Sequence, residues 1–107
     1  MISTHILDTS NGKPAAEIPV RLERFENETW NLIDEQSSNG DGRIVFNCPF
    51  EEGVYRLLFE IDAYFEKNNQ DHFFLRTPVV FKITDVKRKY HVPLLLNPYG
   101  YSTYRGS

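Results

Sequence analysis

Cysteine and long apolar runs are scarce in this 107-residue chain. Its single cysteine, Cys48, excludes a disulfide within the chain, and one free thiol is typical of a reducing compartment. No apolar run approaches the length of a membrane span, and the N-terminal residues lack the basic and apolar regions of a signal peptide. We therefore expect a cytoplasmic protein with no membrane partner.

Excess positive charge is also absent. The chain has 12 lysines and arginines against 15 acidic residues, for a formal net charge of −3, and no basic stripe is visible. This argues against nucleic acid as a partner. The three histidines and one cysteine show no metal-ligand spacing, and no glycine-rich phosphate loop occurs. We expect neither a metal nor a cofactor.

What the chain does have is alternation of apolar and polar residues in short segments bounded by turn residues, which is the pattern of β-strands. The predicted strands are 2–7, 18–23, 30–34, 43–46, 54–61, 79–83, 90–96 and 99–104. The last of these is expected to pair back onto the one before it. Seven or eight short strands in a chain of single-domain size indicate one all-β domain over residues 1–107, an antiparallel β-sandwich.

Only residues 62–69 resemble a helix, of two turns at most, with Asp62 as its expected N-cap. The polar segment that follows predicts a loop in which His72 is solvated. The strongest loop signal is residues 37–42, directly before Arg43. A sandwich must cover or pair its edge strands, and self-association is a common way to do so.

Three residues stand out as chemical candidates. His5 and His91 lie within strand patterns beside apolar residues, where an imidazole with a pKa near ~6.5 can act as base or acid. Arg43 could bind a planar or anionic group. The ordinary interpretation makes all three surface residues. The aromatic run that closes on residues 104–107 suggests a chain end placed in a site, whereas most termini are frayed.

Two segments resemble the transthyretin-like family. The opening His-Ile-Leu-Asp at 5–8 is followed by Gly12, Pro14 and Ala15. The closing residues 91–96 and 98–107 are similar to the 5-hydroxyisourate hydrolase branch of that family, and the likeness runs from about residue 2 to the last. One departure is Asn97, where the family more often has serine.

The resemblance implies a transthyretin-like sandwich with one short helix, assembled as a homotetramer with its site at the interface between dimers. It also implies cofactor-free hydrolysis of 5-hydroxyisourate, in which water activated by a histidine pair opens the ring and arginine stabilises developing charge. The implied residues are His5, His91 and Arg43 for catalysis, and His5, Arg43, Tyr104, Arg105 and Ser107 for substrate binding.

Two alternatives stay open. Hormone carriers of the same fold share the opening pattern and the closing turn but lack both histidines, the arginine and this terminus, so a small-ligand binding module is the first. The second is an interaction sandwich in which the strand histidines are incidental. The sequence also leaves open which histidine is the base and whether the Ser107 carboxylate orients a histidine or holds the tail.

Overall fold

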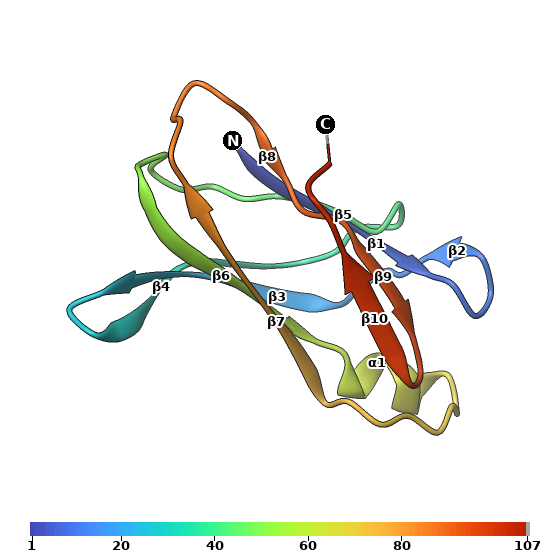
Figure 1. Ribbon diagram of the computed structural model, residues 1–107. Coiled ribbons are helices and arrows are strands. Elements are labelled where there is room, and N and C mark those ends of the chain that lie inside the picture. Colours follow the sequence, from blue (N-terminus) through green and yellow to red (C-terminus); the bar gives the residue numbers. More distant parts are fainter. Residues whose placement is uncertain (107) are drawn as a thin grey trace.

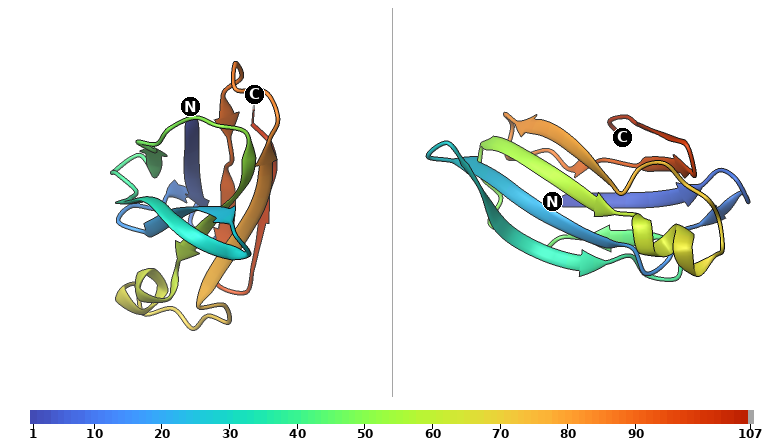
Figure 2. Two further views of the ribbon diagram at one scale, coloured as in Figure 1. Left: turned by 90° about the vertical axis from the view of Figure 1, so that its left-hand side faces the viewer. Right: turned by 90° about the horizontal axis from the view of Figure 1, so that it is seen from below.

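The computed structural model describes residues 1–106 and shows two β-sheets packed face to face, with one short helix at one end (Figures 1 and 2). The predicted all-β sandwich is confirmed. Its elements are β1 (Ile2–Asp8), β2 (Lys13–Pro14), β3 (Pro19–Glu26), β4 (Thr29–Ser37), β5 (Arg43–Val45), β6 (Gly53–Glu60), α1 (Asp62–Lys67), β7 (Arg76–Ile83), β8 (Tyr90–His91), β9 (Leu94–Asn97) and β10 (Gly100–Thr103).

The first sheet is organised around β1. Its strand order is β10-β9-β1-β2, and β5 and β8 also pair with β1. The second sheet has the order β4-β3-β6-β7, and each of its pairings is antiparallel. The pairings are mostly antiparallel, as predicted, but in the first sheet β8 and β9 run parallel to β1. Alternation identifies a strand and its buried face, but it does not specify the direction of the neighbouring strand.

The strand predicted over residues 90–96 is divided into β8 and β9. Pro93 lies in the break and has no N–H to donate to a ladder. Val92 beside it is tied to β1 twice, since its N–H donates to the Ser3 carbonyl at 2.9 Å and its own carbonyl accepts from the Thr4 hydroxyl at 2.6 Å. The predicted return of the last strand is confirmed, because β10 pairs antiparallel with β9.

The core lies between the sheets, and β1 shows how the sequence builds it. Ile2, Thr4 and Ile6 point inward and are buried, whereas Ser3, His5 and Leu7 point outward and are half-buried. From the second sheet, Tyr55, Leu57 and Phe59 of β6 pack against the same core. Burying a large apolar side chain is worth roughly 1.5–3 kcal/mol, so this alternation fixes which face of β1 stays available for chemistry.

The helix prediction is correct in place but wrong in its cap. Ile61 is the N-cap and makes no side-chain capping bond, while Asp62 is the first helical residue. The Asp62 carboxylate instead lies 2.6 Å from Nε2 of His72, whose ring stacks on Phe65. His72 is therefore not solvated, and its side chain is 11% exposed. No helix of the described residues is long and apolar enough to cross a membrane.

Candidate active site

The outer face of the first sheet gathers the three residues that the sequence singled out. In the antiparallel pairing of β1 with β5, His5 lies opposite Arg43. In the parallel pairing of β1 with β8, Ser3 lies opposite His91. Paired residues of neighbouring strands project to the same side of a sheet. Ser3, His5, Arg43 and His91 therefore share one face although they come from three separate parts of the chain.

The loop before β5 fixes the position of Arg43 at the start of that strand. The Asn39 side-chain oxygen accepts hydrogen bonds from the backbone N–H groups of Asp41 and Arg43, at 2.9 and 3.0 Å. Gly42 has a φ of +73°, and a Cβ there would lie 2.5 Å from the carbonyl oxygen of Ile6. Only glycine allows that approach. The tight loop leaves the Arg43 side chain exposed at the sheet surface, where a ligand can reach it.

His91 is half-buried at the centre of this face. Its Nδ1 lies 2.8 Å from the Ser3 hydroxyl oxygen. Burial lowers the pKa of His91 below the usual histidine value, and the nearby positive charge of Arg43 and then of His5 lower it further. At neutral pH the imidazole is therefore uncharged and can accept a proton.

The C-terminal tail lies against His91. The backbone N–H of Gly106 donates to the His91 carbonyl at 2.8 Å, and the two residues form an isolated antiparallel bridge. A Cβ on Gly106 would lie 2.6 Å from Cδ2 of the imidazole. The tail can follow this path only because residue 106 is glycine.

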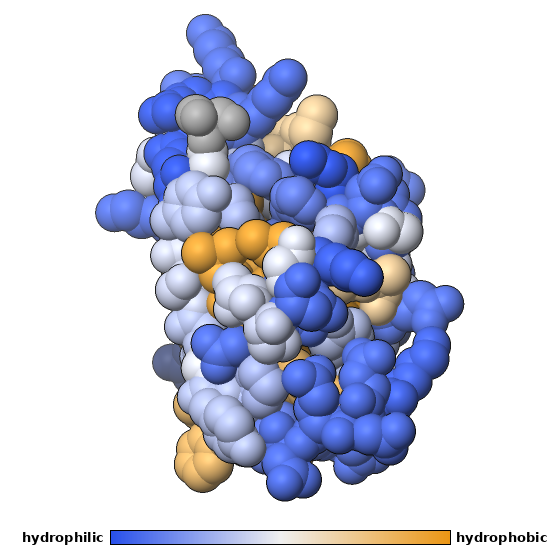
Figure 3. Space-filling view, turned by 90° about the vertical axis from the view of Figure 1, so that its right-hand side faces the viewer, coloured by the Kyte–Doolittle hydropathy of each residue, from blue (hydrophilic) through white to orange (hydrophobic). Residues whose placement is uncertain are grey.

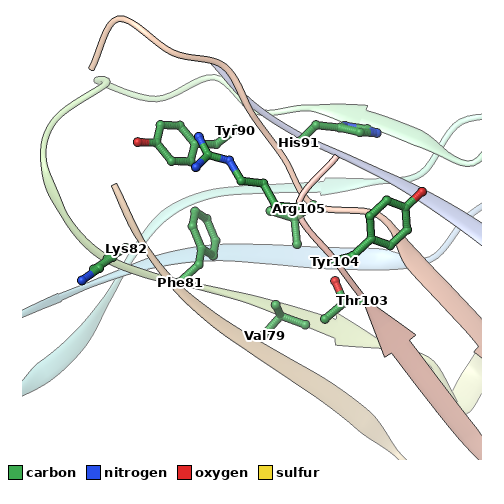
Figure 4. A pocket seen from close by; sticks show the side chains of 9 residues that line it. Val79, Phe81, Lys82, Tyr90, His91, Thr103, Tyr104 and Arg105 are labelled. Carbon is green, nitrogen blue, oxygen red and sulfur yellow. The ribbon is translucent and has the colours of Figure 1, made fainter. Parts of the chain in front are cut away.

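Arg105 and Tyr104 line an apolar pocket beside this bridge (Figure 4). The pocket lies between β7 and the tail, with Val79 and Phe81 contributing from β7. The Arg105 guanidinium lies 4.5 Å from the ring centre of Tyr90, a cation–π contact that ties the tail to β8. Tyr104 is exposed. Ser107, the remaining residue expected in the site, lies outside the described residues.

A second hollow, on the outer face, is lined by residues of β1, β5 and β8. His91 borders both depressions, and Arg43, Lys89 and Ser3 line the outer one. His5 does not line it but lies next to Arg43 across the β1–β5 pair. Among the described residues, the lining of the outer hollow includes two cationic side chains and no carboxylate. This outer hollow favours a planar ligand that is anionic or becomes so.

Ser3 and Lys89 are among the residues of this outer hollow that sequence reasoning missed. Ser3 lies two residues before His5 on β1 and points to the same outer face, so alternation could have drawn attention to it. Lys89 precedes β8 in an exposed turn and carries no such signal. Among residues 1–106 no three histidine, cysteine or acidic side chains gather as metal ligands. A neutral imidazole can take a proton from water, and an arginine beside it can stabilise an oxyanion.

The fold and the face together define a class, the transthyretin-like sandwiches. The first of the two packed sheets pairs β1 with β8 and β9 from near the end of the chain, and one short helix follows the sixth strand. The chain belongs to the HIUase/Transthyretin family, whose sequence model matches residues 2–106.

Named relatives include proteins called hydrolases and a transthyretin. The protein named 5-hydroxyisourate hydrolase in Salmonella typhimurium is 44% identical over 110 residues, covering 100% of this chain and 81% of its own. The structure of Klebsiella pneumoniae 5-hydroxyisourate hydrolase is 37% identical with a TM-score of 0.86, covering 99% and 98%. Sea bream transthyretin in complex with thyroxine is 27% identical with a TM-score of 0.92, covering 98% and 93%. Backbone shape therefore does not separate the hydrolase from the thyroxine-bound transthyretin, and the side chains must.

Proposed function

We propose that this chain hydrolyses 5-hydroxyisourate, opening its six-membered ring on the route of urate degradation toward allantoin. One observation carries the proposal. His5, Arg43 and His91 meet on one exposed face, in a chain that is 44% identical over its whole length to a protein named 5-hydroxyisourate hydrolase.

In the proposed mechanism a histidine pair activates water. Neutral His91 takes a proton as the water oxygen adds to a ring carbonyl. His5 accepts that proton from His91 and relays it to the ring nitrogen when the carbon–nitrogen bond breaks. Arg43 stabilises the negative charge that forms on the carbonyl oxygen. A positioned base of this kind typically contributes ~100- to 10,000-fold in rate. The depressed pKa of His91 supports its part, since it keeps the imidazole unprotonated at neutral pH.

The tail is proposed to complete the substrate site. Tyr104 is exposed beside the site and can stack on or hydrogen-bond to a planar ring. Arg105 is proposed to bind substrate. Its guanidinium also lies over the Tyr90 ring, and this contact supports a second role for Arg105 in holding the tail. The Ser107 carboxylate is proposed to orient a histidine or to pair with a cation.

We further propose a homotetramer with the site at the interface between dimers. Among the strands of residues 1–106, β7 and β10 lie at an edge of their sheets and each pairs with one neighbour. Phe73, Val80 and Tyr101, on or near these edges, leave 72%, 58% and 38% of their surface exposed, and apolar residues are visible on this side of the molecule (Figure 3). Pairing such edges with a second copy would protect them. A further copy against the outer face would then enclose the hollow at His91. Cytoplasmic location stays a prediction.

The competing proposal is a binding module that holds a small ring without reacting with it. The sea bream carrier bound to thyroxine, 27% identical, favours it, as does the apolar pocket beside Tyr104. The two proposals differ in one measurable respect, which is whether the protein shortens the lifetime of 5-hydroxyisourate.

The decisive experiment generates 5-hydroxyisourate in place with urate oxidase and follows its ultraviolet absorbance. Wild-type protein should accelerate the decay, and His91→Asn should lower kcat/KM at least ~100-fold because the base is lost. The matched control, His72→Asn, removes a histidine remote from the hollow and should stay within about 2-fold. Decay at the protein-free rate with wild-type protein would leave the binding module as the better account.

A further inference from the structure

The His91 ring is held along two opposite edges. On one side Nδ1 lies 2.8 Å from the Ser3 hydroxyl oxygen. On the other side the Gly106 backbone comes so close to Cδ2 that a methyl group would not fit. Nδ1 and Cδ2 both adjoin the carbon that joins the ring to its side chain. The ring therefore cannot exchange its edges without losing the Ser3 contact, and Nε2 stays at the free end.

Ser3 is itself fixed by the sheet. It is the parallel register partner of His91, and its carbonyl accepts the Val92 N–H at 2.9 Å. Its neighbours Ile2 and Thr4 are buried in the core, and the Thr4 hydroxyl donates to the Val92 carbonyl. A hydroxyl on so constrained a strand is preorganised, because little freedom is lost when it makes its bond.

The surroundings of the free end distinguish the two neutral forms of the imidazole. A neutral imidazole carries one N–H, and a serine hydroxyl can either donate or accept. The ring is turned away from Tyr90 and Arg105 (Figure 4), and the outer hollow that it lines also contains Arg43 and Lys89. Arginine and lysine are donors without acceptor capacity. They favour a lone pair on Nε2, which requires the proton on Nδ1.

We propose that Ser3 is a positioning residue: its hydroxyl accepts the Nδ1–H of His91 and so selects the tautomer whose Nε2 can take a proton from water. This inference rests on the proposed hydrolase function for its catalytic meaning, but the hydrogen bond and the tautomer can be tested without turnover. Such partners of a catalytic histidine fix which nitrogen is available.

The first test is nitrogen-15 NMR of the histidine rings in the full-length protein above the His91 pKa, with His91 assigned by its loss in His91→Asn. Wild-type His91 should show a protonated Nδ1 and an unprotonated Nε2. Ser3→Ala should shift the population toward Nε2–H, while Ser3→Thr, which keeps a hydroxyl, should retain the wild-type pattern. A wild-type ring protonated on Nε2 would overturn the proposal whether or not any variant folds.

The second test separates positioning from binding by kinetics with 5-hydroxyisourate. Ser3→Ala should lower kcat about 10-fold with KM within about 2-fold, because one oriented hydrogen bond to the base is lost. Ser3→Thr should recover most of kcat, and Ser37→Ala, an exposed serine of the second sheet, should match wild type. An unchanged kcat in Ser3→Ala would overturn the positioning role. Wild-type protein with the expected tautomer but no turnover would overturn the hydrolase proposal alone.

Discussion

At the scale of single residues, Gly106 shows most directly how residue type controls the geometry of the site. Its backbone donates to the His91 carbonyl while the missing side chain leaves room for the imidazole. Its role is steric and does not depend on unusual dihedral freedom. The tail and the His91 imidazole therefore occupy adjoining space, and a change in one must move the other.

We predict that Gly106→Ala lowers kcat/KM about 10-fold or more, because the new methyl group at 2.6 Å from Cδ2 must displace the tail or the ring. The free energy of unfolding should fall by only about 1 kcal/mol, since one backbone hydrogen bond is at stake. Steady-state kinetics and chemical denaturation measure the two quantities.

The control for this change is Gly40→Ala, where a Cβ would meet nothing within 4 Å. That variant should keep wild-type activity. If Gly106→Ala behaves like Gly40→Ala, the tail does not constrain His91.

Candidate residues could be named from the sequence, but their partners could not. His5, Arg43 and His91 are prominent because of residue type and because of the family resemblance. Ser3 cannot be recognised in this way, since a serine in a strand has no chemical signal until its register partner, here His91, is known. The sequence predicts a solvated His72, because periodicity does not reveal that its loop folds back onto Asp62 and Phe65.

At the scale of elements, the segment that follows α1 packs against the hairpin of β9 and β10 and so joins the helix to it by contacts. His72 is held by the Asp62 carboxylate at its Nε2. The next residue, Phe73, donates its N–H to the Pro98 carbonyl at 2.9 Å, and Phe74 packs edge-on against Tyr101. The His72–Asp62 pair thus anchors the segment that supports the turn of the C-terminal hairpin.

We predict that this anchor stabilises the fold in a pH-dependent way. The Asp62 hydrogen bond raises the pKa of His72 above its usual value, so the folded state binds the proton more tightly than the unfolded state does. The stabilisation is complete below the unfolded pKa of about 6.5 and is lost as the pH rises through the folded pKa. The Tm difference between wild type and His72→Asn should therefore be larger at pH 6 than at pH 9.

Asp62→Asn should reproduce this pH dependence, because it removes the charge that holds the imidazolium. A Tm difference that is the same at both pH values would contradict an electrostatic anchor and leave only the stacking of His72 on Phe65.

Elements were more predictable than their connections. Alternation located most of the strands, because burial of one face of a strand imposes a period of two. The segment that resembles a helix, residues 62–69, was also placed correctly. Alternation did not show that β8 and β9 are separate strands or that they run parallel to β1. Those facts depend on hydrogen bonds between segments at opposite ends of the chain, such as Val92 to Ser3.

At the scale of the whole molecule, the proposed tetramer can be tested on the outer face of the first sheet. Val45 of β5 is the register partner of Ser3 and is 58% exposed. If another copy covers this face, Val45→Lys would place a charge in a desolvated interface and should shift the assembly from four chains of 12.5 kDa toward two. Analytical ultracentrifugation measures the mass.

The matched control is Val86→Lys, an exposed valine in the turn between β7 and β8. It should assemble as the wild type does. A Val45→Lys protein that stays tetrameric would place any interface between dimers elsewhere on the surface.

The parallel pairing of β1 with β8 and β9 also has a consequence for synthesis. The first strand emerges from the ribosome long before its partners, and contacts so distant in sequence form slowly because a long loop must close first. The second sheet, made of β3, β4, β6 and β7, can pair while β1 still lacks β8 and β9. The pocket at His91 can be complete only after residue 106 has been translated. A nascent chain would therefore carry an incomplete site and an unpaired side of β1, which is the stage at which a chaperone would be of most use.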